Sequence, residues 1–222
     1  MADTDETEDS GSTAASRTTY ICGNAIVKAA KEILMTGSDS ARAQCDFPEI
    51  PGENGVHSMF GYIVQGVKIK INPVTGAVDV LKAHNVTEAG HVLHPEMMAG
   101  QLFGGMAMST GYTLSEQIRY QKGKAMEDSF ASYVMPTSMD APHMTNDNVD
   151  CYEESGPYGA KGVAEAATVA LAPAVAAAVR RVCPKLLIRT IPIDREQILD
   201  AMMENEGGTG NVFYSASCGY CF

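Results

Sequence analysis

Residues 156–165 read Gly-Pro-Tyr-Gly-Ala-Lys-Gly-Val-Ala-Glu, a glycine-rich loop that leads into an alanine-rich, helix-forming stretch. A loop of this kind exposes backbone N–H groups, and the helix N-terminus that follows adds a favourable field for anions. The pattern predicts a loop that can hold a phosphate or another oxyanion. It is not a nucleotide P-loop, which needs Gly-Lys-Ser/Thr, because Lys161 follows Ala160 and precedes Gly162. Glu165 falls where loop becomes helix, and its spacing alone indicates a first-turn carboxylate that favours the helix dipole.

The long segment from Pro95 to Gln117 carries an otherwise helical Met/Leu/Phe pattern that four glycines interrupt. These glycines are Gly100, Gly104, Gly105 and Gly111. Each interior glycine costs a helix roughly 1 kcal/mol relative to alanine, so something must approach this backbone closely. Tight packing against another element explains the pattern, and so does a cofactor that lies against the helix.

The remaining patterns mix strands with helices. Val67, Ile69 and Ile71 alternate with lysines and lead into turn residues at 72–76, which predicts a β-hairpin. One further helix is expected to end at Gly37. A second is expected from Glu165 to Arg181, with a possible kink at Pro173, and a third from Asp194, where a capping box begins. This mixture predicts an α+β fold with mixed short sheets and helices. We expect four segments: 1–37 as a loop and helix, 38–58 as a connector, 59–205 as the α+β domain and 206–222 as a tail.

Charge and hydropathy exclude several classes of function. The 222 residues have a net charge of −11 and a pI near 4.8 with no basic cluster, which argues against a nucleic-acid partner. The longest nearly apolar stretch, 166–179, falls short of the roughly 20 residues that a membrane-spanning helix needs. The acidic N-terminus lacks the basic and apolar regions of a secretory signal, so the expected compartment is the cytoplasm.

Two groups of residues in the sequence could form a metal or redox site, and the evidence for each site is weak. Cys218 and Cys221 have CxxC spacing but lack a second pair and a following helix, so we expect reduced thiols. His84, His91 and His94 lack the spacing of a helical metal site, and we expect them in surface loops.

Five groups of segments, in the same order, resemble one family: the molybdenum hydroxylases of the xanthine dehydrogenase and aldehyde oxidoreductase type. The segments are Thr13-Ala-Ala-Ser-Arg-Thr18 with Cys22-Gly-Asn-Ala25, then 67–76, then Glu88-Ala-Gly90 with Leu93-His-Pro95 and Gly100-Gln-Leu-Phe-Gly-Gly105, then Ser129-Phe-Ala-Ser-Tyr133 with Pro136-Thr137 and Asp140-Ala-Pro142, and finally 156–165. The last is similar to the family's Gly-Pro-x-Gly-Ala-Lys-Gly-x-Gly-Glu. The resemblance is to the C-terminal part of the molybdopterin-binding subunit, and it implies the second molybdopterin-binding domain of the xanthine dehydrogenase type.

The resemblance also implies a set of site residues. Glu165 becomes a general base, which in the family takes a proton from a hydroxyl on molybdenum, and Gln101 becomes a hydrogen-bonding partner of the pterin. The other implied cofactor-binding residues are Ala14 and Ala15 beside the metal, Ser16, Arg17 and Thr18 at the phosphate region, and Gly159, Ala160, Lys161 and Gly162 along the pterin. The pterin dithiolene, and no protein side chain, is the implied ligand of molybdenum.

The implied function is that of a C-terminal portion or split subunit of a molybdenum-dependent hydroxylase. Such an enzyme oxidises an N-heteroaromatic, purine-like substrate or an aldehyde with oxygen from water. The implied cofactor is molybdenum-molybdopterin, with the cytosine dinucleotide form expected, while iron–sulfur clusters and FAD belong on partner modules. The implied partners are the chain that carries the N-terminal molybdenum half, an iron–sulfur subunit and a flavin subunit.

Two alternatives stay open. One is a catalytically inactive truncated or assembly-partner form of the same fold, and the other is a phosphate-binding module that uses residues 156–165. Three positions depart from the family pattern: Ala164 replaces the glycine before the glutamate, and Glu88 and His94 stand where Asp and Asn are usual. These departures weaken the assignment of the loop on the cofactor side to the family pattern.

Overall fold

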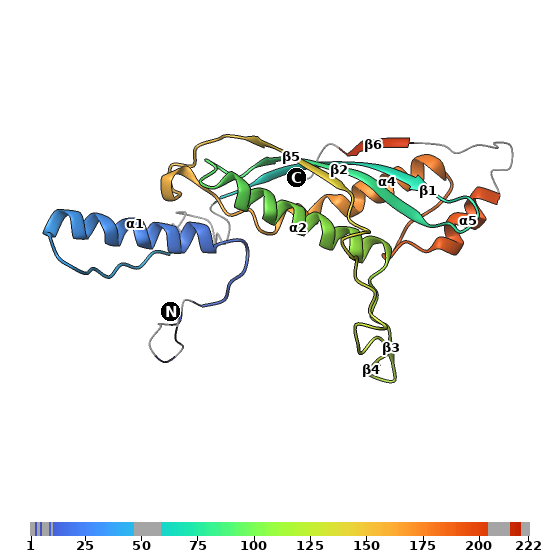
Figure 1. Ribbon diagram of the computed structural model, residues 1–222, viewed down its shortest axis with the longest axis horizontal. Coiled ribbons are helices and arrows are strands. Elements are labelled where there is room, and N and C mark those ends of the chain that lie inside the picture. Colours follow the sequence, from blue (N-terminus) through green and yellow to red (C-terminus); the bar gives the residue numbers. More distant parts are fainter. Residues whose placement is uncertain are drawn as a thin grey trace, which may run out of the picture.

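A four-stranded sheet with helices on one face forms the body of the molecule (Figure 1). The computed structural model of the chain describes residues 3, 5, 9, 11–46, 59–203 and the strand at 214–218. The strands of the sheet lie in the order β5-β2-β1-β6, with β1 at Tyr62–Ile71, β2 at Val78–Glu88, β5 at His143–Val149 and β6 at Tyr214–Cys218. Strands β1 and β2 are antiparallel, β6 is antiparallel to β1, and β5 is parallel to β2. The expected α+β class is confirmed.

The β1–β2 hairpin follows the expected alternation and extends beyond it. Residues 63, 65, 67, 69 and 71 of β1 are buried, and the residues between them face outward. The turn is held by Asn72, whose Oδ1 accepts hydrogen bonds from the backbone N–H groups of Val74 and Thr75. The sequence pattern does not predict the half of each strand that lies away from the turn, because Gln65 and Asn85 there are polar residues on the buried face.

Helix α2 (Pro95–Leu114) is continuous despite its four glycines. It buries Met98, Leu102 and Met106. Packing accounts for Gly105, where a Cβ would meet the Cβ of Ala167 at 2.6 Å, and for Gly111, where it would overlap the Glu116 carboxylate. A Cβ at Gly100 or at Gly104 would meet no described atom within 4 Å.

The prediction of one helix over 165–181 is wrong in one respect, because the segment forms two helices. Helix α3 spans Ala166–Val169, and α4 spans Leu171–Val182. Proline has no N–H, and its ring clashes with the carbonyl four residues earlier, so Pro173 excludes a continuous helix through Val169. The chain therefore breaks at Ala170 rather than kinking at the proline, and Pro173 lies in the first turn of α4. The fully buried face of α4 forms the centre of the core with Ile69 of β1 and Ile198 of α5 (Arg195–Met203).

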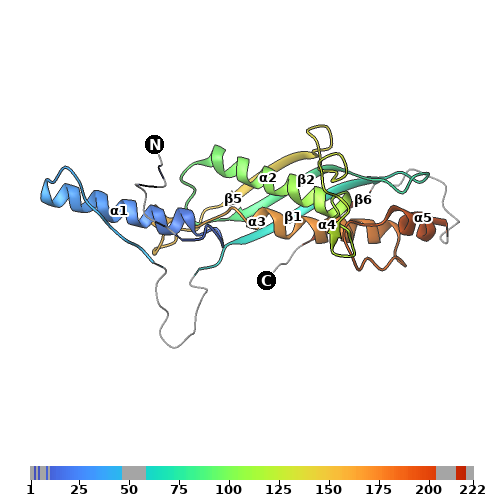
Figure 2. The ribbon, with the colours of Figure 1, turned by 90° about the horizontal axis from the view of Figure 1, so that it is seen from below.

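Helix α1 (Thr18–Thr36) projects from one end of the elongated molecule (Figures 1 and 2). Its expected stop is confirmed, since Gly37 adopts a left-handed conformation with φ of 67° and donates its N–H to Ile33. Its large apolar side chains are not buried, however: Ile26 is 67% exposed, Leu34 is 84% exposed, and Tyr20 is the one buried residue among those the helix contains. Among the described residues, no helix is long and apolar enough to cross a membrane.

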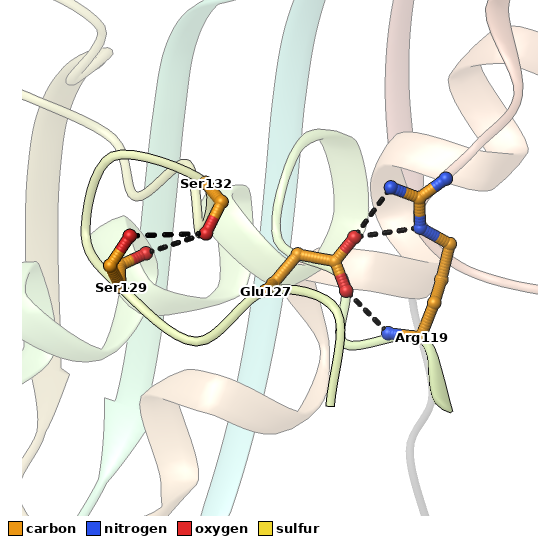
Figure 3. Close-up of polar contacts among 4 residues, drawn as sticks. All are labelled: Arg119, Glu127, Ser129 and Ser132. Atoms are coloured by element: carbon orange, nitrogen blue, oxygen red, sulfur yellow. Dashed lines mark hydrogen bonds and ion pairs between the residues drawn. The ribbon is translucent and has the colours of Figure 1, made fainter. Parts of the chain in front are cut away.

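Residues 115–142 form an arm that extends away from the sheet and carries a small hairpin of β3 (Tyr120–Gln121) and β4 (Lys124–Ala125) (Figure 1). An ion pair between Arg119 and Glu127 closes this hairpin (Figure 3). Glu127 Oε2 accepts the backbone N–H of Arg119 at 2.6 Å, and Oε1 accepts the guanidinium Nε–H at 2.7 Å. The large apolar side chains exposed on the arm are Ile118, Tyr120, Met126, Phe130, Val134, Met135 and Met139.

The closure of this hairpin is expected to loosen in acid. The backbone N–H of Arg119, and then its guanidinium, hold the pKa of Glu127 below its ordinary value of 4.5. A carboxyl with a lowered pKa stabilises the folded arm fully above its ordinary pKa and loses that contribution as the pH falls through the lowered one. The amide resonance of Arg119, followed by NMR from pH 7 to pH 3, should therefore move with a midpoint below 4.5. A midpoint at or above 4.5, or an unchanged profile in Glu127→Gln, would contradict this prediction.

Candidate functional site

A cavity of about 490 Å³ lies where three segments of the chain meet. One wall comes from residues 13–19, the second from 89–94 and the first turns of α2, and the third from the glycine-rich loop at 160–165. The side chains and backbone that line it belong to Thr13, Ala14, Ser16, Thr18, Thr19, Ala89, His91, Val92, Leu93, His94, Met97, Met98, Gln101, Ala160, Lys161, Val163, Ala164 and Glu165. Three segments that are far apart in the sequence thus enclose one site.

The glycine-rich loop is fastened to the segment between β2 and α2. Gly90 and Ala160 form an isolated antiparallel bridge, the backbone N–H of Lys161 donates to Ala89 at 2.9 Å, and the N–H of His91 donates to Gly159 at 2.7 Å. Gly90 has φ of 71°, and a Cβ there would overlap the Gly159 carbonyl oxygen. Only glycine allows the two backbones to lie this close.

Glu165 connects the other end of the glycine-rich loop to residues 13–18. The backbone N–H of Ala15 donates to Glu165 Oε1 at 3.1 Å, and the N–H of Glu165 donates to Ser16 Oγ at 3.0 Å. A Cβ on Gly162 would overlap the carbonyl oxygen of Ser16, so the two loops cross with no side chain between them. Glu165 precedes the four-residue α3 and makes no capping hydrogen bond, so its carboxylate is engaged across the cavity and not with its own helix.

Ala15 and Ser16 both have a left-handed backbone, with φ of 52° and 53°. Residues other than glycine adopt this conformation at a cost of order 1–3 kcal/mol each. The cost is offset where the surroundings impose the conformation, and here both residues contact Glu165. Strain of this kind concentrates at binding and catalytic sites.

Lys161 is engaged inside the protein. Its ammonium donates to Glu88 Oε2 at 2.9 Å and to the Phe60 carbonyl at 2.8 Å, and the Lys161 and Glu88 side chains are 9% and 11% exposed. Glu88 Oε1 also accepts the backbone N–H of Gly90 at 2.8 Å. Glu88, one of the departures from the family pattern, therefore holds the 88–90 turn and the glycine-rich loop together.

The expectation that the three histidines lie in surface loops is correct for His91 only. His84 lies in β2, where Nδ1 meets Thr145 Oγ1 at 2.8 Å. His94 is the N-cap of α2, and its Nδ1 accepts the N–H of Met97 at 3.2 Å. No group of three or more His, Cys, Asp or Glu side chains in the described part of the chain could hold a metal ion. Cys221 lies outside the described residues.

The structure brings the site residues expected from the sequence into one place. Those that line the cavity are Ala14, Ser16, Thr18, Gln101, Ala160, Lys161 and Glu165. The others, Ala15, Arg17, Gly159 and Gly162, lie in the same two loops without lining it.

Sequence reasoning missed the support behind Glu165. The buried Gln65 donates from Nε2 to Asn85 Oδ1 at 2.6 Å and to the carbonyl oxygen of Ala167 in α3 at 2.9 Å. These bonds fix α3 on the sheet directly after Glu165. The only signal in the sequence is that Gln65 and Asn85, both polar, stand at strand positions where the alternation predicts apolar residues. Such a pair by itself argues against a strand.

Comparisons with known proteins match this chain to one family. Residues 35–142 match the molybdopterin cofactor-binding domain family. The chain is 30% identical over 179 residues to a probable xanthine dehydrogenase subunit of Bacillus subtilis, covering 80% of this chain and 24% of that protein. It is 29% identical over 172 residues to the 6-hydroxypseudooxynicotine dehydrogenase complex subunit gamma of Paenarthrobacter nicotinovorans, covering 72% of this chain and 21% of that one. The chain thus spans less than a quarter of the length of these relatives.

Solved structures show the same fold. Aldehyde oxidoreductase from Desulfovibrio desulfuricans superposes with a TM-score of 0.73 at 24% identity, covering 89% of this chain and 24% of that one. Quinoline 2-oxidoreductase from Pseudomonas putida superposes with a TM-score of 0.59 at 28% identity, covering 64% of this chain and 19% of that one.

Proposed function

Because this chain belongs to the molybdenum hydroxylase family, as part of its molybdopterin-binding subunit, we propose that it supplies the general base and one wall of a molybdenum–pterin site. The observation that carries the proposal is the Glu165 carboxylate. It lines the cavity, lies at the crossing of two loops, and has Oε1 fixed by the N–H of Ala15. A carboxylate held in this way is pre-positioned to accept a proton.

The residues present fit a pterin cofactor. Gln101 offers one amide N–H₂ group and one carbonyl to a pterin edge, which has complementary donors and acceptors. The walls beside it are apolar, from Val92, Met98 and Val163, which suits a flat heterocycle. Packing does not explain Gly100 and Gly104. Because these two glycines have no side chains, the exposed side of α2 beside Gln101 stays accessible to a cofactor.

When bound, a molybdenum–pterin group supplies a Lewis acid and a two-electron acceptor. Glu165 would act as the proton acceptor beside such a group, through Oε2, because Oε1 already accepts the N–H of Ala15. Ser16 Oγ holds the Glu165 backbone in place, and Gln65 holds α3 behind it. Ala14 and Ala164 line the same cavity as Glu165 with short side chains, which leave room for a substrate ring.

The substrate proposed first is an N-heteroaromatic ring. Relatives at 28–30% identity carry names that refer to xanthine, 6-hydroxypseudooxynicotine and quinoline oxidation, and xanthine and quinoline are N-heteroaromatic rings. An aldehyde is the second candidate and is separated from the first by the experiment below. The cytosine dinucleotide form of molybdopterin completes the proposal for the cofactor.

The proposed partners are the polypeptide that carries the remainder of the molybdopterin-binding subunit, an iron–sulfur subunit and a flavin subunit. Two exposed apolar surfaces support the first of these: the side of α1 with Ile26 and Leu34, and the arm with Phe130. Because half of the pocket then comes from another polypeptide, the chain alone should be inactive, which is also the property of the truncated or assembly-partner alternative.

The test is to co-express the chain with the remaining subunits, purify the assembly, and quantify molybdenum, pterin and nucleotide. We expect about one molybdenum and one pterin per copy of the chain, and hydroxylation of an N-heteroaromatic substrate in preference to an aldehyde. An assembly that forms without molybdenum would contradict the catalytic proposal and favour the inactive alternative. Preference for an aldehyde would change only the substrate class.

A further inference from the structure

His91 and Asp150 form a pair at the cavity that the proposed base chemistry does not use. His91 Nδ1 lies 3.1 Å from Asp150 Oδ2, and the Tyr152 ring lies beside the imidazole with centroids 6.5 Å apart. His91 lines the cavity, while Asp150 follows β5 directly and approaches from behind. The carboxylate fixes the ring orientation, and it assigns a proton to Nδ1.

The other positively charged or imidazole groups of the cavity are already engaged. The Lys161 ammonium is paired with Glu88, and His94 Nδ1 accepts a hydrogen bond from the backbone of α2. With Nδ1 of His91 held by Asp150, Nε2 is left for a ligand, and it makes no hydrogen bond with any other residue of the described ranges. When the ring is protonated, Nε2–H is a charged donor of the kind that binds phosphate oxygens.

The glycine-rich loop separates His91 from Glu165. The loop contacts His91 at Gly159, and it contacts residues 15 and 16 at its other end, through Gly162 and Glu165. Asp150 places a second carboxylate at the His91 end, so distance from Glu165 alone does not favour an anion there. What distinguishes the His91 end is an imidazole whose Nε2 has no partner in the described ranges and, on a protonated ring, donates a charge-assisted hydrogen bond.

We propose that His91, oriented by Asp150, is an anion contact of the cavity and binds a phosphate oxygen of the pterin cofactor at the end of the glycine-rich loop away from Glu165. This inference rests on the proposed function, because it takes the pterin as the ligand of the cavity. It adds a phosphate contact that is distinct from the loop at residues 13–18.

The molecule contains a matched control pair. His84 Nε2 lies 3.5 Å from Asp147 Oδ2, so a second histidine–aspartate pair joins β2 to β5, and neither of its members lines the cavity. The two histidine side chains, His91 and His84, are 48% and 45% exposed, so their solvation is alike. The control differs in one respect, because both ring nitrogens of His84 are engaged, Nδ1 by Thr145 and Nε2 by Asp147. A difference between the two responses therefore reports on the unengaged Nε2 of His91 in the cavity.

The first measurement uses the full wild-type chain and needs no variant. Histidine imidazole resonances are followed by ¹H–¹⁵N NMR during titration with inorganic phosphate, pyrophosphate and cytidine monophosphate. We expect the His91 Nε2 resonance to shift with saturation while that of His84 does not. Stronger binding of pyrophosphate or cytidine monophosphate than of phosphate would indicate the dinucleotide form of the cofactor. Equal, non-saturating shifts at both histidines would mean an adventitious ion only and would overturn the proposal.

The second measurement uses the assembled protein, in which molybdenum, pterin and phosphorus are quantified per chain. His91→Leu should hold at least about fivefold less pterin than wild type, Asp150→Ala should lie between them, and His84→Leu should match wild type. Wild type that holds no pterin would refute the proposed function itself. Wild type that holds pterin, with His91→Leu equally loaded, would refute only the role of His91.

Discussion

Replacement of Glu165 by glutamine should lower hydroxylation by the assembled enzyme about 10²- to 10⁴-fold, the usual contribution of a general base. Glutamine keeps the length and shape of the side chain, and its amide oxygen can still accept the N–H of Ala15. The hydrogen bond from the backbone of residue 165 to Ser16 is unchanged, so the crossing of the two loops should persist. What the variant loses is an oxygen that can take a proton.

The measurement is kcat/KM on the assembly, together with molybdenum and pterin content. Glu196→Gln is the matched control, because Glu196 is a carboxylate in the first turn of α5 and tests the helix-dipole interpretation. We expect the control to keep its activity. Unchanged turnover in Glu165→Gln would remove the base assignment, and loss of the cofactor from this variant would give Glu165 a binding role instead.

Replacement of Lys161 by methionine should lower the free energy of unfolding by about 3–5 kcal/mol, because it leaves the buried Glu88 carboxylate without its counter-charge. Glu88 keeps the N–H of Gly90 at Oε1, but Oε2 loses its partner. The Phe60 carbonyl loses its donor as well. Urea unfolding of the full chain, followed by circular dichroism, measures the change.

The double variant Lys161→Met/Glu88→Gln separates charge from packing. Its glutamine can still accept from Gly90 and carries no charge, so we expect it to recover part of the lost stability. A cost below about 1 kcal/mol for the single variant would mean that solvent screens the pair as it screens a surface ion pair. In that case the fastening of the glycine-rich loop would depend on its backbone bridge to Gly90.

The parts of the fold that could be read from the sequence are those whose signals are local. The end of α1 at Gly37, the turn at residues 72–76 and the start of α5 at Asp194 each depend on a few adjacent residues, and each is where the sequence predicts it. The break before α4 is also local, but it follows from a clash four residues before Pro173, so the kink expected at the proline itself is wrong.

The rest depends on contacts between distant segments. No strand is predicted for residues 143–149, because their polar character gives no buried face and only the parallel pairing with β2 defines them. That pairing brings Asp150 to His91 and the glycine-rich loop to Gly90. The Glu165 assignment came from the resemblance, whereas its hydrogen bond to Ala15 spans 150 positions and no local pattern could reveal it.

The polar composition of β5 has a consequence for contacts between copies of the folded chain. β5 is an outer strand of the sheet, so one side of its backbone offers unpaired N–H and C=O groups that another extended chain could join. Its residues read His-Met-Thr-Asn-Asp-Asn-Val, in which only Thr145 and Val149 are β-branched and the strand-promoting aromatic residues Phe, Tyr and Trp do not occur. The exposed edge of the sheet at β5 is therefore expected to resist strand pairing between copies of this chain.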